Sequence, residues 1–159
     1  MKTQIVYDSY FSNTEQIANA IGDSLGSKGE VAVSKVSNIT VEELVGAELL
    51  IVGSPTRAFR PTNPIVTFLL EIPDNSLKGM KVAAFDTRIC IADLKSRMLT
   101  VLVKLLGYAA KPIAKRLKKK GGELIITPEG FFVKGTEGPL KEGELERAEN
   151  WAKQIIEAL

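Results

Sequence analysis

Four short and almost uninterrupted apolar runs constrain the fold of this chain more than any other feature. They lie at residues 5–7, 49–52, 82–85 and 124–126. Such runs are typical of parallel strands that helices cover on both faces, because neither face of such a strand needs polar side chains. A further segment, in which Val31 and Val33 alternate with polar neighbours, is typical of an edge strand.

Segments with the apolar spacing of helices separate these runs. The expected helices are residues 13–27, 40–45, 62–70, 109–120 and 145–159, with glycines near several of their ends. Regular alternation of strand and helix predicts an α/β fold: a doubly wound, five-stranded parallel sheet in the order 2-1-3-4-5 with helices on both faces. A chain of 159 residues without repeats or low-complexity linkers suits a single domain, residues 1–159.

Composition removes several classes of function. The chain has no histidine, so the commonest general base and metal ligand is absent, and we predict no catalytic residue and no metal site. Cys90 is the only cysteine, which excludes an internal disulfide and suits a reducing cytoplasm. The N-terminal residues run directly into a strand, so we expect no export signal and a cytoplasmic protein. The longest apolar stretch, residues 98–106, is too short to span a bilayer, so we also expect no membrane span. A net charge of +2 does not indicate nucleic-acid binding.

The loop after the first strand places hydroxyl and amide side chains in front of a helix. Ser9, Ser12, Asn13 and Thr14 lie close together there. Such a loop collects free backbone N–H groups at the positive end of the helix dipole, and its hydroxyls add donors for an anion. The alternative is that Ser12 or Asn13 only caps the helix. The loop lacks the motifs of nucleoside-triphosphate and dinucleotide sites and has no cysteine, so the expected ligand is a terminal phosphate monoester.

Residues 7–15 resemble the phosphate loop of flavodoxins, which holds the phosphate of FMN. The resemblance implies a flavodoxin-like fold, FMN as the cofactor and electron transfer as the function. It also implies that Ser9, Ser12, Asn13 and Thr14 bind the phosphate, and that Tyr10 and Phe11 of the same loop belong to the cofactor site. Phe11 and Ser12 stand where the family usually has threonine and glycine, and the loss of the glycine restricts the backbone.

Two further loops resemble the segments with which flavodoxins cover the flavin ring. One begins with Gly-Ser-Pro-Thr at residues 53–56, and the other begins at Asp86. The resemblance implies that the ring is bordered by residues of both loops: Pro55, Thr56, Arg57, Ala58, Phe59, Asp86, Thr87 and Arg88. Phe59 is the candidate stacking partner, because the tryptophan and tyrosine common in these loops are absent. The cations of Arg57, Arg60 and Arg88 near the ring would favour a less negative redox couple than that of a low-potential carrier.

The connection after the third of these loops is unusual. Residues 93–106 are apolar nearly all round, a pattern most typical of a core helix, with a flap over the flavin or a homodimer face as alternatives. The basic run at residues 115–120 suits a solvated helix end, with a docking patch for an acidic redox partner as the alternative. It has no interleaved aromatic residues, so we expect no nucleic acid. We expect an irregular loop at residues 127–140, with Phe131 and Phe132 packed on the sheet.

Together with the resemblance, these features predict an FMN-binding, flavodoxin-like electron-transfer protein. Its expected partners are redox proteins, either a reductase or a ferredoxin-like donor or acceptor. One alternative is an FMN-dependent NAD(P)H:quinone-type oxidoreductase, in which residues 93–106 and the arginines would form a substrate pocket. The other is a cofactor-free interaction module that keeps the flavodoxin fold.

Overall fold

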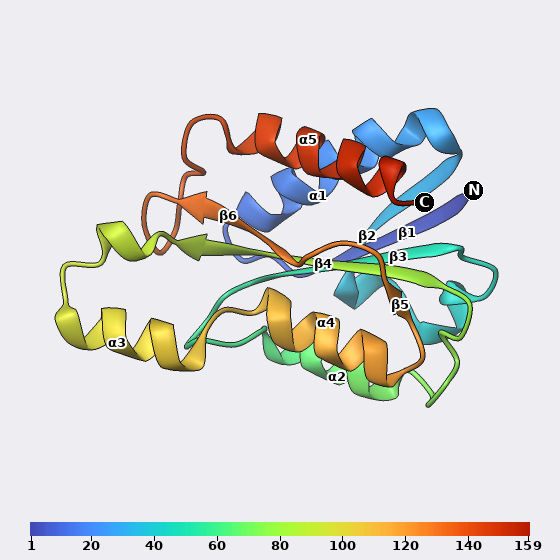
Figure 1. The fold of residues 1–159 in the computed structure, drawn as a ribbon, viewed down its shortest axis with the longest axis horizontal. Coiled ribbons are helices and arrows are strands. Elements are labelled where there is room, and N and C mark those ends of the chain that lie inside the picture. Colours follow the sequence, from blue (N-terminus) through green and yellow to red (C-terminus); the bar gives the residue numbers. More distant parts are fainter.

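The computed structural model describes every residue from Met1 to Leu159 and contains one parallel sheet between two layers of helices (Figure 1). The sheet order is β2-β1-β3-β4-β5, and each neighbouring pair is parallel, as predicted. The strands are β1 (Lys2–Tyr7), β2 (Glu30–Lys35), β3 (Leu49–Pro55), β4 (Lys81–Ile89), β5 (Glu123–Leu124) and β6 (Glu129–Val133).

The fifth strand position is divided between two short pieces. β5 pairs with the beginning of β4, whereas β6 pairs in parallel with its end, through Phe85 to Ile89. Pro128 lies between the pieces, and a proline cannot donate a hydrogen bond to a neighbouring strand. The expectation of an irregular loop over residues 127–140 is therefore wrong for β6, and the strand expected at residues 124–126 includes only Leu124.

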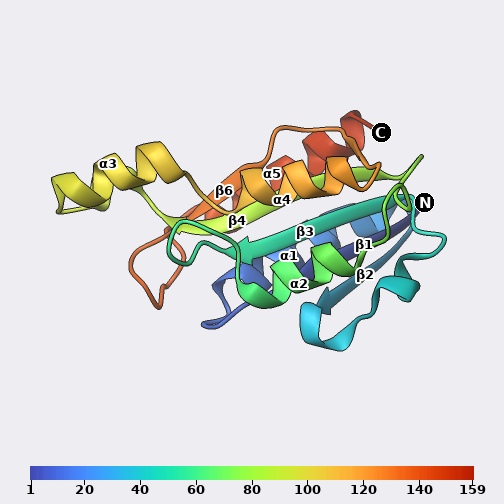
Figure 2. The ribbon, with the colours of Figure 1, turned by 90° about the horizontal axis from the view of Figure 1, so that it is seen from below.

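Helices cover both faces of the sheet, and their bounds lie close to those predicted. α1 and α5 lie on one face, and α2 and α4 lie on the other (Figures 1 and 2). The helices are α1 (Asn13–Leu25), α2 (Asn63–Glu71), α3 (Arg97–Leu106), α4 (Ala110–Lys119) and α5 (Glu144–Glu157). The segment expected at residues 40–45 is a 3-10 turn, Val41–Leu44, closed by a capping box of Thr40 and Glu43.

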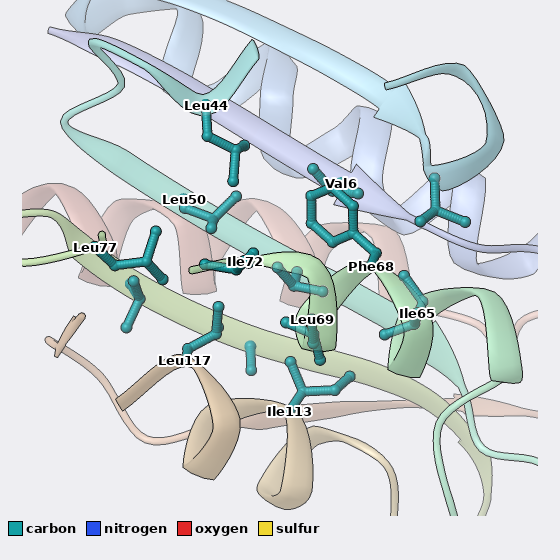
Figure 3. Close-up of a cluster of buried hydrophobic side chains, with 14 of the residues drawn as sticks. Val6, Leu44, Leu50, Ile65, Phe68, Leu69, Ile72, Leu77, Ile113 and Leu117 are labelled. Carbon is teal, nitrogen blue, oxygen red and sulfur yellow. The ribbon is translucent and has the colours of Figure 1, made fainter. Parts of the chain in front are cut away.

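Each face of the sheet carries its own apolar core. On the α2 and α4 side, residues such as Leu50, Phe68 and Leu117 interdigitate (Figure 3). On the α1 and α5 side, the rings of Phe85, Phe131 and Trp151 meet edge to face, with centroids 6.0 to 6.2 Å apart. Neighbouring strand residues point to opposite faces, so uninterrupted apolar runs fill both cores. Phe131 packs in the core as expected, whereas Phe132 is only half-buried.

Helix α3 lies outside both layers. It projects beyond the end of the sheet where β4 and β6 terminate (Figure 2). Of its large apolar residues only Val103 is buried, while Met98 is 70% exposed and Leu105 is 76% exposed. The expectation that residues 93–106 form a core helix is therefore wrong. No helix of the structure, α3 included, has the length and apolar character needed to cross a membrane.

Candidate cofactor-binding site

A cavity of about 440 Å³ lies at the carboxyl ends of β1, β3 and β4. At this point the order of strands reverses, because β2 lies on one side of β1 and β3 lies on the other. Open α/β sheets usually bind their ligands at such a reversal of strand order. The lining residues come from four segments at or just beyond strand ends: Ser9, Tyr10, Phe11, Asn13 and Thr14; Pro55, Thr56, Arg57 and Ala58; Thr87, Arg88 and Ile89; Val133, Gly135 and Thr136.

Most of the residues predicted from the sequence come together here, but three do not line the cavity. The Ser12 side chain is exposed, Phe59 is half-buried outside the cavity, and Asp86 is completely buried beside it. Sequence reasoning missed four lining residues, which are Ile89, Val133, Gly135 and Thr136. Three of these follow from β6, whose β-type run Gly-Phe-Phe-Val was the signal that could have revealed them.

The first loop presents a row of backbone donors that have no partner in the chain. None of the N–H groups from Tyr10 to Glu15 donates to another protein group, and Gln16 N is the first to do so, to Ser12 O at 3.0 Å. Ser12 adopts a left-handed conformation (φ 60°, ψ 2°), and its side chain does not cap α1. Ser12 therefore occupies the N-cap position, but the alternative that the side chain of Ser12 or Asn13 caps the helix is wrong. Free N–H groups at a helix start attract an anion.

Buried hydroxyls adjoin these donors. Ser9 is buried and its Oγ has no hydrogen-bond partner, which is costly unless a ligand supplies one. Thr14 is also buried, and its Oγ1 lies 2.8 Å from Oγ1 of Thr87, which links the first and third loops. Asn13 Nδ2 donates to Glu137 O at 3.0 Å and ties the last loop to the first. This set of neutral donors fits a phosphate monoester.

Arg88 lines the cavity, but its charge is paired with that of Asp86. Its Nε and a terminal nitrogen donate to the two carboxylate oxygens of Asp86 at 2.5 and 2.7 Å. The guanidinium also stacks on Tyr108, 3.9 Å from the ring centroid. Burial raises the pKa of Asp86, and the Arg88 cation and the Ala110 N–H, at 2.7 Å, oppose that rise. The pair cancels the positive charge that the sequence suggested for Arg88.

Arg57 lies at the cavity on a tight turn. Its N–H donates to Arg60 O at 2.9 Å and the Arg60 N–H returns the bond at 3.1 Å. The two residues between them, Ala58 and Phe59, have φ values of 47° and 66°, which are unfavourable for residues with a side chain. The guanidinium carbon of Arg57 lies 5.3 Å from the centroid of the Tyr10 ring. The Arg57 side chain forms no ion pair. Arg57 is thus the uncompensated cation of the cavity.

The sequence and the fold were compared with known proteins. Residues 5–86, more than half of the chain, match the family model described as Flavodoxin. A comparison with curated protein sequences gave no match. Oxidised Flavodoxin 2 from Bacillus cereus is 24% identical, with a TM-score of 0.79 over 100% of both chains.

Other solved structures share the fold. A flavodoxin from the domain Archaea is 24% identical and gives a TM-score of 0.77 over 99% of this chain and 97% of its own. Rubredoxin oxygen:oxidoreductase from Desulfovibrio gigas is 23% identical and matches 99% of this chain with 35% of its own, at a TM-score of 0.73. With the family match over β1 to β4 and the cavity that these strands build, the chain belongs to the flavodoxin family and is an FMN-binding electron-transfer protein.

Proposed function

We propose that FMN binds in the cavity described above with its phosphate on residues 9–15. The observation that carries this proposal is the set of unpartnered donors: the N–H groups from Tyr10 to Glu15 and the buried Oγ of Ser9. A phosphate dianion would satisfy these donors together, in a place where the α1 dipole favours negative charge. When bound, FMN supplies the redox chemistry, and the chain supplies binding, orientation and electrostatics.

For the flavin ring, we propose the remaining lining residues of the second and third loops. Pro55, Thr56, Arg57 and Ala58 would border it from one side, and Thr87, Arg88 and Ile89 from the other. Two hydrogen bonds fix the position of Thr56. Its Oγ1 accepts from Ala109 N at 3.0 Å, and its N–H donates to Thr87 O at 2.9 Å.

We further propose that this single domain, residues 1–159, is an electron carrier rather than a reductase with its own substrate. The only ionisable side chains that line the cavity are Tyr10, Arg57 and Arg88, and no carboxylate, thiol or imidazole is among them. Of these three, only Tyr10 is of a type that acts as a general acid or base, and its side chain is largely exposed to solvent. Its donor and acceptor would be a reductase and a ferredoxin-like protein, and its free Cys90 suits a reducing cytoplasm.

The phosphate contact is tested by titrating the apoprotein with FMN and with riboflavin, which lacks the phosphate. Replacing Ser9 by alanine removes a donor to a charged group and should weaken FMN by about tenfold or more. Riboflavin binding should not change. Ser12→Ala is the matched control in the same loop, since that side chain is exposed and does not line the cavity. Equal losses for FMN and riboflavin in Ser9→Ala would contradict the assignment.

The carrier function is tested by mixing the FMN-loaded protein with NADH or NADPH alone. We expect the flavin absorbance to bleach slowly without a reductase and rapidly when one is added. Rapid bleaching by a nicotinamide alone would support the oxidoreductase instead. A homodimer through residues 93–106, the other partner that the sequence suggests, is tested together with the surface described below.

A further inference from the structure

Positive charge is concentrated in one segment of the chain. Residues 94–120 hold nine of the 21 lysines and arginines and none of the 19 acidic residues. The remaining residues therefore have 12 basic and 19 acidic side chains, so the two parts of the molecule have opposite net charge. Within this segment only Lys120 forms an ion pair, with Asp74 at 2.8 Å. The other cations of the segment lack an acidic partner in the molecule.

The same segment contains the helix with the most exposed large apolar side chains. On α3 the exposed apolar side chains are Met98, Leu99, Val101, Leu105 and Leu106. Met98, Val101 and Leu105 follow a spacing of three and four residues, which places them on one face. Arg97, Thr100 and Lys104 have the same spacing one position earlier and form a neighbouring polar stripe. Helix α3 is therefore amphipathic, with its apolar face toward solvent.

Helix α3 projects from the molecule beyond the end of the sheet, and α4 follows it in the chain on the face that α2 also covers (Figures 1 and 2). Lys111, Lys115, Lys118 and Lys119 are exposed on α4, the next helix along the chain. The base of the projection is fixed: the Tyr108 hydroxyl donates to Ile89 O at 3.3 Å, and Lys141 forms an ion pair with Asp93. Since Ile89 also lines the cavity, the connection that follows the carboxyl end of α3 lies beside the cofactor site.

We propose that α3 and the exposed lysines of α4 form a surface that binds anionic lipid bilayers. The apolar face of α3 enters the boundary between headgroups and acyl chains, while Arg97, Lys104 and the α4 lysines contact lipid phosphates. An amphipathic helix with Leu on one side and Lys or Arg on the other is typical of such binding. Each cation near an anionic surface strengthens the attachment, which stays peripheral because no helix can span the bilayer.

Two other occupants fit less well. A second copy of the chain, docked α3 against α3, would bring the cations of two segments together with no carboxylate between them. An acidic protein would match the charge, but the exposed face of α3 is built from Met, Leu and Val without the Trp, Tyr or Arg that dominate most protein interfaces. A projecting aliphatic helix face can enter a bilayer without a complementary pocket, because lipids adapt to its shape.

The proposal is tested by flotation of the full-length protein with vesicles of equal parts phosphatidylglycerol and phosphatidylcholine. We expect the protein to float with these vesicles at low salt and to remain below with vesicles of phosphatidylcholine alone. Leu105→Ser should weaken the partition by about tenfold, because this exposed leucine would otherwise be buried in lipid. Lys104→Glu should weaken it by at least about fivefold.

Matched controls separate these effects from general changes in apolar surface or charge. Leu70→Ser removes an exposed leucine from α2, and Lys28→Glu reverses a charge outside the segment, so neither should change the partition. FMN titration of each variant confirms that the fold is intact, since these side chains do not line the cavity.

Three results would overturn the proposal. One is wild-type protein that does not float with anionic vesicles. A second is floating that Leu105→Ser and Lys104→Glu leave unchanged. The third is a dimer in sedimentation velocity that Leu105→Ser converts to a monomer, since α3 would then be an interface between copies. None of these results bears on FMN binding, so the proposed function is judged separately.

Discussion

Replacing Arg88 by methionine should destabilise the folded protein by about 3–5 kcal/mol, the usual cost of leaving a buried charge without its partner. Asp86 is 0% exposed, and two of its three hydrogen bonds come from Arg88. In the variant only the Ala110 N–H would remain. At about 2–4 °C per kcal/mol for a chain of this size, the melting temperature should fall by roughly 6–20 °C.

The loss of stability should also depend on pH. Burial already raises the pKa of Asp86, and removal of Arg88 removes the main opposing effect. A carboxyl group with a raised pKa in the folded state favours folding below its unfolded pKa, and this contribution is lost as the pH rises through the folded value. Urea denaturation should therefore show a larger difference between wild type and Arg88→Met at about pH 8 than at about pH 5.

A double variant provides the control. Asp86→Asn combined with Arg88→Met removes both charges, so its loss should be smaller than that of Arg88→Met alone and should not grow with pH. A loss in Arg88→Met below about 1 kcal/mol, or an equal loss at both pH values, would refute the reasoning, because Asp86 would then not depend on Arg88.

Two further predictions concern the cavity and the core. Arg57→Gln should make the potential of bound FMN more negative by on the order of 40 mV in a redox titration, because Arg57 is the uncompensated cation there. Arg60→Gln should leave it unchanged, since Arg60 does not line the cavity, and equal shifts would contradict this. Gly53→Ala should cost about 1–3 kcal/mol in urea denaturation, since a Cβ would lie 2.1 Å from the Phe85 ring. Gly26→Ala, with open space around it, should cost nothing, and an equal loss there would refute the steric argument.

The sheet order and the helices could be predicted because their signals are local. Uninterrupted apolar runs such as residues 49–52 predict strands buried on both faces, and the helices between them give parallel pairing. The division of the last strand was missed because it depends on a distant contact. β6 forms because it pairs with β4, which is distant in the sequence. Pro128, just before β6, is a residue typical of loops and therefore favoured the prediction of a loop.

The first loop of the site was predictable for the same reason. Its donors, from Ser9 to Thr14, are neighbours in the sequence and precede a strong helix pattern. Val133, Gly135 and Thr136 come from a segment more than a hundred residues away, and the β-type run at residues 130–133 predicts a strand without showing that its end lies beside the first loop. The pairing of Arg88 with Asp86 could be predicted in part, because residues two apart on a strand point to the same face of the sheet, and both residues lie on β4.

The character of α3 could not be decided from its periodicity. A helix that is apolar on most sides can be buried in the core, or it can be exposed and bind another molecule. The pattern of side chains is the same in both cases. The distinction lies in the chain around it, since the connections at Cys90 and Gly107 carry α3 away from the sheet. The lack of acidic residues in residues 94–120 is visible in the sequence. It indicates a binding surface only once the structure shows that α3 is exposed.

The central claim is that backbone N–H groups of residues 10–15 hold the phosphate of FMN. Amide resonances in ¹H–¹⁵N spectra of the apoprotein test this most directly, with FMN, riboflavin and inorganic phosphate added in turn. FMN and inorganic phosphate should both shift the amides from Tyr10 to Glu15, whereas riboflavin should leave these in place and shift those of the second and third loops. Equal shifts of residues 10–15 by FMN and riboflavin, or no shift with inorganic phosphate, would contradict the account.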